Sequence, residues 1–205
     1  PDMDQPQSPV GLGARQLQMI AIGSAIGMAK MALHLKKPVH IVSSGRGSSL
    51  TKLNELLPDY KEYAPIYVSG EEASKLVSAN SLLFIVDHHR PMLSAHPPLL
   101  NLVSKRVVVD HHRRAEDFIE KPLLTYMEPS ASSTSELVTE LLQYFDDRMD
   151  FSRLEASALY AGIVVDTKNF AVQTGARTFD AASFLRKAGA DPNMMDLFIW
   201  HGAEE

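Results

Sequence analysis

Two continuous apolar runs in the middle of the chain predict buried parallel strands. The first covers residues 81–86 and ends at Asp87, and the second covers residues 105–109 and ends at Asp110. Neither run alternates apolar and polar positions, and this pattern is typical of strands that are covered on both faces of a parallel sheet. Two shorter strands are predicted as well, at residues 39–42 and 65–68.

Segments with helical periodicity separate these strands. The strongest is the amphipathic stretch 133–146, where Ser133 or Thr134 is expected to cap the first turn and Glu136 lies within it. Gly189 is expected to end the last helix. The alternation of the two kinds of element predicts an α/β fold, a mostly parallel sheet flanked by helices. The predicted helices are 21–35, 49–57, 71–78, 133–146, 153–165 and 178–188.

The composition indicates a globular domain without thiol chemistry. Of the 205 residues, 45% are hydrophobic and 22% are charged, and the formal net charge is -5. Such a surface has no general attraction to a nucleic-acid backbone, so no large nucleic acid is expected as a partner. Cysteine is absent, so a metal would have to be bound by His, Asp or Glu. The sequence contains no long apolar run and opens without a signal peptide, so we expect a cytoplasmic domain.

Polar side chains gather where the two long strands end. Asp87 and Asp110 are each followed by two histidines, at positions 88–89 and 111–112. Because ligands bind outside the carboxyl ends of the strands in open α/β sheets, both carboxylates should reach the functional edge. A single Asp after a strand is more often a turn former. Two Asp-His-His triplets together predict a site for Mn, Zn or Fe, since carboxylate and imidazole suit these metals.

Two further acidic features are compatible with a metal site. Asp166 directly follows the small and apolar residues 161–165, and a buried carboxylate at this place needs a cation or strong donors. Backbone amides that cap the carboxylate would satisfy it equally well. The pair Asp2 and Asp4 can place one carboxylate on each of two neighbouring cations, although acidic chain ends are usually just solvated.

Taken in order, these segments resemble the DHH phosphoesterase superfamily. Within it, the likeness is greatest to the GdpP-like (YybT-like) cyclic-di-AMP phosphodiesterases, because of the segments 166–170 and 174–182. The resemblance covers most of residues 21–199. It rests on residues 1–4 with 21–27, and on residues 86–91, 109–114 and 162–167.

The resemblance implies a centre of two manganese ions. Asp2 would bind the first ion and Asp4 the second, and Asp87 would bridge both. His111 and Asp166 would complete the second ion. Two cations of this kind clamp the attacking and leaving oxygens and generate hydroxide from a bound water. The reaction implied is the opening of cyclic-di-AMP to the linear dinucleotide pApA.

The resemblance also implies residues that meet the substrate. His112 would face the scissile phosphate and act as its hydrogen-bond donor or acid. Arg113 would add positive potential nearby, and His89 is the imidazole of the preceding motif and is expected in the substrate site.

The resemblance further implies how the chain is organised. Residues 21–205 would be the DHH catalytic domain, and residues 1–20 a truncated first motif with an irregular insertion or foreign segment. The first-motif histidine would lie ahead of Pro1. The partner DHHA1 domain, with its Gly-Gly-Gly-His signature, is not in this sequence and would act in cis. The parent protein would be anchored in the cell membrane, and a homodimer remains open.

Three alternatives stay open at this point. A nanoRNase or 3'-phosphoadenosine phosphatase of the same superfamily would share the metals and differ in substrate. A nucleotide-binding regulatory module with an impaired metal site would share the fold without the activity. A manganese-type pyrophosphatase is less favoured, because it too has a partner domain that this sequence lacks.

Overall fold

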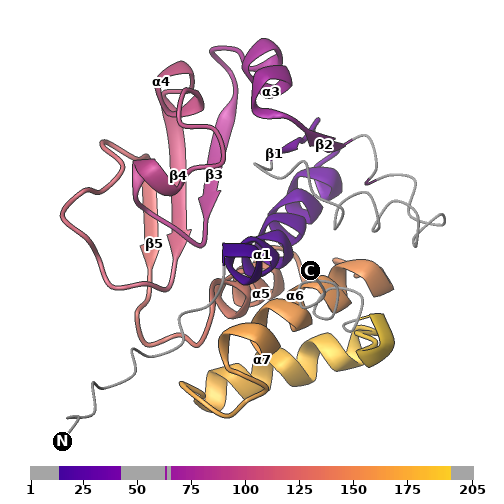
Figure 1. Cartoon of the computed structure of the whole chain (residues 1–205). Helices are drawn as coiled ribbons and strands as arrows, with labels where there is room; N and C mark the ends of the chain where they lie inside the picture. The colour runs from indigo at the N-terminus through magenta and orange to yellow at the C-terminus, as the bar shows by residue number, and fades with distance from the viewer. Residues whose placement is uncertain (1–13, 43–62, 64–65, 195–205) are drawn as a thin grey trace, which may run out of the picture.

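A computed structural model describes residues 14–42, 63 and 66–194, with side chains described from residue 21 onward. Its elements confirm the predicted α/β class (Figure 1). Asp2, Asp4 and the predicted helix 49–57 lie outside the described residues. The elements are α1 (Ala14–His34), β1 (Ile41–Val42), β2 (Tyr67–Val68), α3 (Gly70–Leu76), β3 (Leu82–Val86), the 3₁₀ helix η2 (Pro91–Leu93), α4 (Leu99–Leu102), β4 (Lys105–Asp110), β5 (Leu124–Met127), α5 (Thr134–Phe145), α6 (Arg153–Asp166) and α7 (Ala176–Lys187).

All strand pairs in the described part of the chain are parallel, as predicted. One sheet has the order β3–β4–β5, and a smaller one pairs β1 with β2. The sequence did not predict β5, because its four residues are short for a strand signal and include the polar Thr125. It adds a third parallel strand beside β4, with Asp110 opposite Met127.

The prediction that both long strands are covered on both faces holds for β4 and is wrong for β3. Val107, Val108 and Val109 of β4 are buried, whereas Leu82 and Phe84 of β3 are 47% and 36% exposed. The exposed residues alternate with Leu83 and Ile85, which pack in a core cluster with Leu100 and Val108. Strand β3, at one edge of the sheet, is therefore covered on one face only.

Helix α1 starts at Ala14, seven residues before the predicted start at residue 21, so residues 14–20 are helical. The helix packs closely on α5 and α6 because it has glycine at two contact positions. A methyl group on Gly23 would lie 2.4 Å from the Ala158 carbonyl oxygen, and one on Gly27 would lie 2.6 Å from the Val138 side chain. These close approaches hold α1 against α5 and α6.

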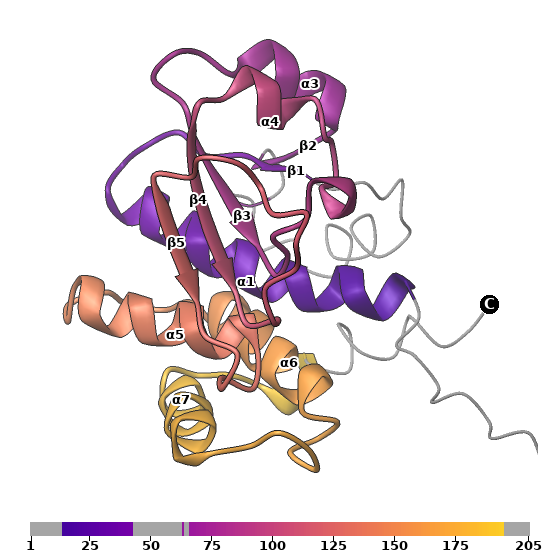
Figure 2. The same cartoon turned by 90° about the vertical axis from the view of Figure 1, so that its left-hand side faces the viewer.

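Helices α1 and α5 cross one face of the sheet, with α6 and α7 beyond them (Figure 2). Apolar side chains from β4, α5, α6 and α7 form the largest core cluster. Ser133 is the N-cap of α5, as predicted, and its side chain accepts a hydrogen bond from the Glu136 amide. The arrows of β3, β4 and β5 point toward this helical layer (Figure 1). His111, directly after β4, contacts Ala131 before α5 and lies 3.9 Å from Asp166 at the end of α6.

Candidate metal centre

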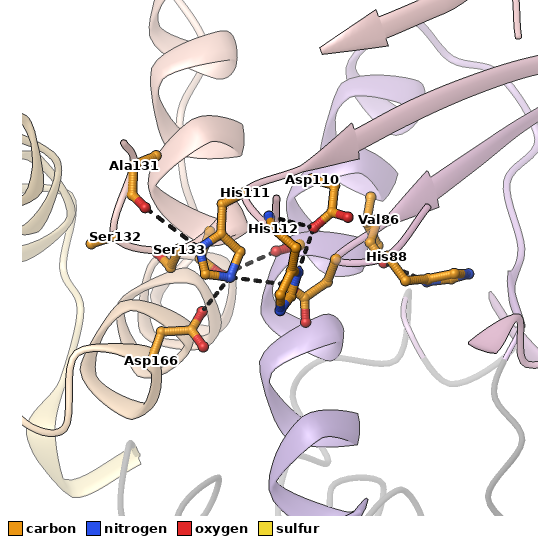
Figure 3. A network of polar contacts seen from close by, with 12 residues as sticks. Val86, His88, Asp110, His111, His112, Ala131, Ser132, Ser133 and Asp166 are labelled. Atoms are coloured by element: carbon orange, nitrogen blue, oxygen red, sulfur yellow. Dashed lines mark hydrogen bonds and ion pairs between the residues drawn. The ribbon is translucent and has the colours of Figure 1, made fainter. Parts of the chain in front are cut away.

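Three of the predicted metal ligands converge, although they come from three separate elements. Asp87 follows β3, His111 follows β4, and Asp166 is the last residue of α6. The His111 Nε2 atom lies 3.8 Å from Asp87 Oδ1 and 3.9 Å from Asp166 Oδ2 (Figure 3). One ligand atom from each of Asp87, His111 and His112 also lies within 4.8 Å of the others.

The three converging atoms have no hydrogen-bond partner. Asp87 Oδ1, His111 Nε2 and Asp166 Oδ2 are all buried and unsatisfied. Buried polar atoms without partners are uncommon, and each costs about 1–3 kcal/mol. The distances of 3.8 and 3.9 Å are too long for direct hydrogen bonds between them. A shared cation would satisfy all three atoms at once.

The backbone explains how Asp87 enters the cluster. Its amide still donates to the Val109 carbonyl oxygen at 3.0 Å, which extends the parallel ladder by one bond. Its φ of 65° then turns the chain sharply out of the sheet. Asp is one of the few residues with a side chain that adopts this left-handed conformation without a large penalty.

The local electrostatics favour neutral forms in the absence of a cation. Burial raises the pKa of Asp87 to about 7, although the charge of His112 and the Thr134 hydroxyl act in the opposite direction. Burial and the neighbouring Asp87 raise the pKa of Asp166 to about 8. Burial lowers the pKa of His111. A divalent cation would reverse the effect on the carboxylates, because it stabilises their charged forms.

His111 has the tautomer that a metal ligand requires. Its Nδ1 atom lies 3.4 Å from the Ala131 carbonyl oxygen, which can only accept a hydrogen bond. The proton is therefore assigned to Nδ1, and the Nε2 lone pair faces the two carboxylates. This donation to a backbone carbonyl is the outer-shell contact that metal-bound histidines usually make. The residues present fit a divalent metal ion.

Asp110 organises the histidines and is not itself free to bind a cation. Its Oδ1 accepts from His112 Nδ1 at 2.7 Å and from the His112 amide at 3.2 Å, and its Oδ2 accepts from His89 Nδ1 at 2.6 Å. Burial would raise the pKa of Asp110, but the hydrogen bonds from His112 and His89 outweigh it and lower the pKa to about 2. The sequence analysis did not predict that Asp110 accepts hydrogen bonds from the histidines. The two-residue spacing of Asp110 and His112 could have indicated it, because Asp side chains often accept hydrogen bonds from residues two positions later.

The ring of His112 is held by a hydrogen bond on one side and is exposed on the other. The hydrogen bond to Asp110 raises the pKa of His112, and its side chain is 47% exposed. Because Nδ1 is engaged with Asp110, Nε2 is the ring atom left for other chemistry. This geometry suits the predicted donor to a substrate.

His89, predicted in the substrate site, is buried in this structure and braces Asp110. It is 3% exposed, its Nδ1 donates to Asp110, and its Nε2 accepts from the Ala115 amide at 2.8 Å. No ring nitrogen is left for a ligand. The ring of His88 points away from the cluster (Figure 3), with Nδ1 lying 3.1 Å from the Val86 carbonyl oxygen. Arg113 is exposed beside the site.

The electrostatics predict how the stability of the metal-free protein depends on pH. Asp87 and Asp166 titrate near 7 and 8 when folded, against an ordinary value of 3.8. Between about pH 4 and 8 the folded state therefore binds more protons than the unfolded state, so these two groups make the free energy of unfolding fall as pH rises. Each group contributes a slope of at most about 1.4 kcal/mol per pH unit.

The variant Asp166→Asn isolates this effect. We expect it to be more stable than the unsubstituted protein at pH 8 and nearly equal at pH 4, in urea unfolding of chelator-treated samples. Because Asp166 interacts electrostatically with Asp87 and His112, the difference reports the charge of Asp166 together with its effect on these two neighbours. A stability difference that does not change with pH would show that Asp166 is charged in the metal-free fold.

Three comparisons with known proteins place this geometry in context. The sequence profile described as "DHH family, N-terminal domain" matches residues 19–163. The cyclic-di-AMP phosphodiesterase GdpP of Geobacillus thermodenitrificans is 48% identical over 191 residues, and that of Bacillus subtilis is 46% identical over 190 residues. Each alignment covers 92% of this chain and 29% of the relative, so the chain spans less than a third of their length.

The fold also matches a solved structure. An exopolyphosphatase-related protein from Bacteroides fragilis superposes with a TM-score of 0.72, at 21% identity, over 91% of this chain and 54% of the other. At this identity the match supports the fold alone. Within the described residues, no helix is long and apolar enough to span a membrane.

Proposed function

This chain belongs to the DHH family, and we propose that it is the catalytic domain of a manganese-dependent phosphodiesterase that hydrolyses cyclic-di-AMP to pApA. The observation that carries the proposal is the convergence of three buried, unpartnered ligand atoms from Asp87, His111 and Asp166. The substrate is inferred from relatives that are 46–48% identical and named cyclic-di-AMP phosphodiesterases.

Two manganese ions are proposed, with Asp87 as their bridge. Its carboxylate lies at the centre of the cluster, within reach of both His111 and His112. His111 and Asp166 would hold one ion with it, and Asp2 and Asp4 stay the predicted ligands that complete the pair. When bound, such ions supply a hydroxide nucleophile and neutralise the phosphodiester.

The protein's own groups would then guide the bond cleavage. The oxygen of water attacks phosphorus, the bond from phosphorus to the 3' oxygen breaks, and that oxygen takes up a proton. We propose that His112 Nε2 gives this proton to the 3' oxygen or donates a hydrogen bond to it. The Asp110 carboxylate holds the ring through Nδ1 and favours its protonated form. Arg113, exposed nearby, is kept as a proposed electrostatic contact to the phosphate.

The remaining partners are proposals that concern the longer protein. Because the relatives are more than three times as long as the matched segment, we propose that a DHHA1 domain in cis contributes to nucleotide binding. Anchoring of the parent in the cell membrane, with this domain in the cytoplasm, stays a prediction, and so does a homodimer.

Parallel turnover assays test the substrate. We expect the protein with manganese to release pApA from cyclic-di-AMP, with a kcat/KM at least about tenfold above its values for pApA and for 3'-phosphoadenosine 5'-phosphate. Chromatography of the products measures all three reactions. The same samples with chelator are the control.

Two results would redirect the proposal. Faster cleavage of pApA or of the monophosphorylated nucleotide would favour the nanoRNase or phosphatase alternative. Binding of cyclic-di-AMP without turnover of any substrate, in a protein that retains no manganese, would favour the regulatory module.

A further inference from the structure

Glu136 is a buried carboxylate that departs from the usual capping chemistry of its helix. It is the third residue of α5 and is 1% exposed, and Ser133 caps the helix. In a capping box, the glutamate at this position accepts a hydrogen bond from the amide of the N-cap residue. Glu155 does so at the start of α6, where it accepts from the Ser152 amide at 2.7 Å. Glu136 instead accepts from the amide of Ser132, the residue before the cap, at 3.2 Å.

Three donors converge on one oxygen of this carboxylate. Oε2 of Glu136 accepts from the amide and the hydroxyl of Ser132, and from the Thr178 hydroxyl at 2.8 Å. Thr178 is 1% exposed and lies in the first turn of α7, where its hydroxyl also accepts from the Gly175 amide at 3.0 Å. Because a buried carboxylate is costly without such partners, these contacts hold the segment before α5 in one arrangement.

One peptide group connects Glu136 with the metal centre. The Ser132 amide and the Ala131 carbonyl are the two ends of the same planar unit. Glu136 accepts from the amide end, and the carbonyl oxygen at the other end lies 3.4 Å from His111 Nδ1 (Figure 3). A peptide group that is held at its amide end has a fixed carbonyl direction. The carboxylate therefore sets where the ring of His111 can donate.

We propose that Glu136 is a positioning residue, which fixes the Ala131–Ser132 peptide and through it holds the His111 ring with Nε2 toward the cation. Groups that orient metal-bound histidines from outside typically contribute 10- to 100-fold to metal affinity. This role explains why the carboxylate reaches past the cap residue Ser133 to the amide before it. The inference rests on the metal site of the proposed function and is independent of the nucleotide substrate.

The tautomer of His111 in the metal-free protein tests this role. We expect the nitrogen-15 spectrum of a histidine-labelled, chelator-treated sample at neutral pH to show the His111 proton on Nδ1, with the signal assigned by its loss in His111→Ala. Glu136→Ala releases the peptide group, so we expect a mixture of both tautomers. Glu136→Gln keeps a side-chain oxygen that can accept from the Ser132 amide, so it should restore the Nδ1 form.

Manganese affinity should follow the tautomer. In calorimetric titration we expect Glu136→Ala to raise the dissociation constant for manganese at least about tenfold, and Glu136→Gln to stay within about threefold of the unsubstituted protein.

Glu155→Ala is the matched control. Glu155 has the same helix position and the same 1% exposure, and it lies at the opposite end of α6 from Asp166. Both alanine variants should lower the melting temperature of the metal-free protein by about 4–8 °C, because each leaves buried donors without an acceptor. Glu155→Ala should nevertheless leave the manganese dissociation constant within about twofold.

Four results would overturn the inference. A proton on His111 Nε2 in the unsubstituted, metal-free protein would do so without any variant. Unchanged manganese affinity in Glu136→Ala would also do so, and in both cases the metal site itself stands. An equal loss of affinity in Glu155→Ala would show that Glu136 acts only through the stability of the fold. If the unsubstituted protein binds no manganese, the proposed function fails and the inference fails with it.

Discussion

Replacing Asp87 by alanine is expected to abolish turnover and manganese binding together. Asp87 is the carboxylate proposed to touch both ions, and its Oδ1 atom is buried without any other partner. Loss of the bridge removes several kcal/mol of charge stabilisation from the transition state, which corresponds to a fall in kcat of at least about 10³-fold. Manganese content by mass spectrometry and turnover of cyclic-di-AMP measure the two effects.

Asp117→Ala is the control for this substitution. Asp117 is an exposed carboxylate, 46% accessible, that pairs with Arg90 on the surface. Surface pairs of this kind contribute about 0–1 kcal/mol, so activity and metal content should stay within about twofold. Near-normal activity of Asp87→Ala would contradict the ligand assignment.

Replacing His112 by alanine is expected to separate metal binding from catalysis. Its Nδ1 atom is committed to Asp110, and its exposed edge is proposed to face the phosphate. Manganese should therefore be retained, while kcat falls by about 10²–10⁴-fold, the usual contribution of a positioned general acid. His111→Ala is the matched comparison, because it should lose manganese as well as activity.

Loss of manganese from His112→Ala would change the role assigned to His112. Its ligand atom lies in the same cluster as those of Asp87 and His111. If His112→Ala loses manganese to the same extent as His111→Ala, His112 is a metal ligand and the proton must come from another group.

The sequence predicted most of the structure that depends on local pattern. Long apolar runs revealed β3 and β4, and the residues after them, Asp87 and His111, do lie at one edge. The convergence of Asp166 was anticipated only through the resemblance to the family, because burial alone was equally consistent with a capped carboxylate. The short strand β5 gave no signal, since its four residues are too few to show periodicity.

Details that depend on long-range hydrogen bonds could not be predicted. His89 looked like a substrate residue by its place in the motif, yet its two ring nitrogens are occupied by Asp110 and the Ala115 amide. These partners lie 21 and 26 residues away along the chain, so only the packed fold shows them.

Anomalous diffraction from a manganese-soaked crystal tests the metal centre most directly. We expect two peaks at the carboxyl edge of the sheet, both in contact with Asp87 and one also bound by His111 Nε2 and Asp166 Oδ2. Manganese bound elsewhere, with these three side chains touching no ion, would contradict the account.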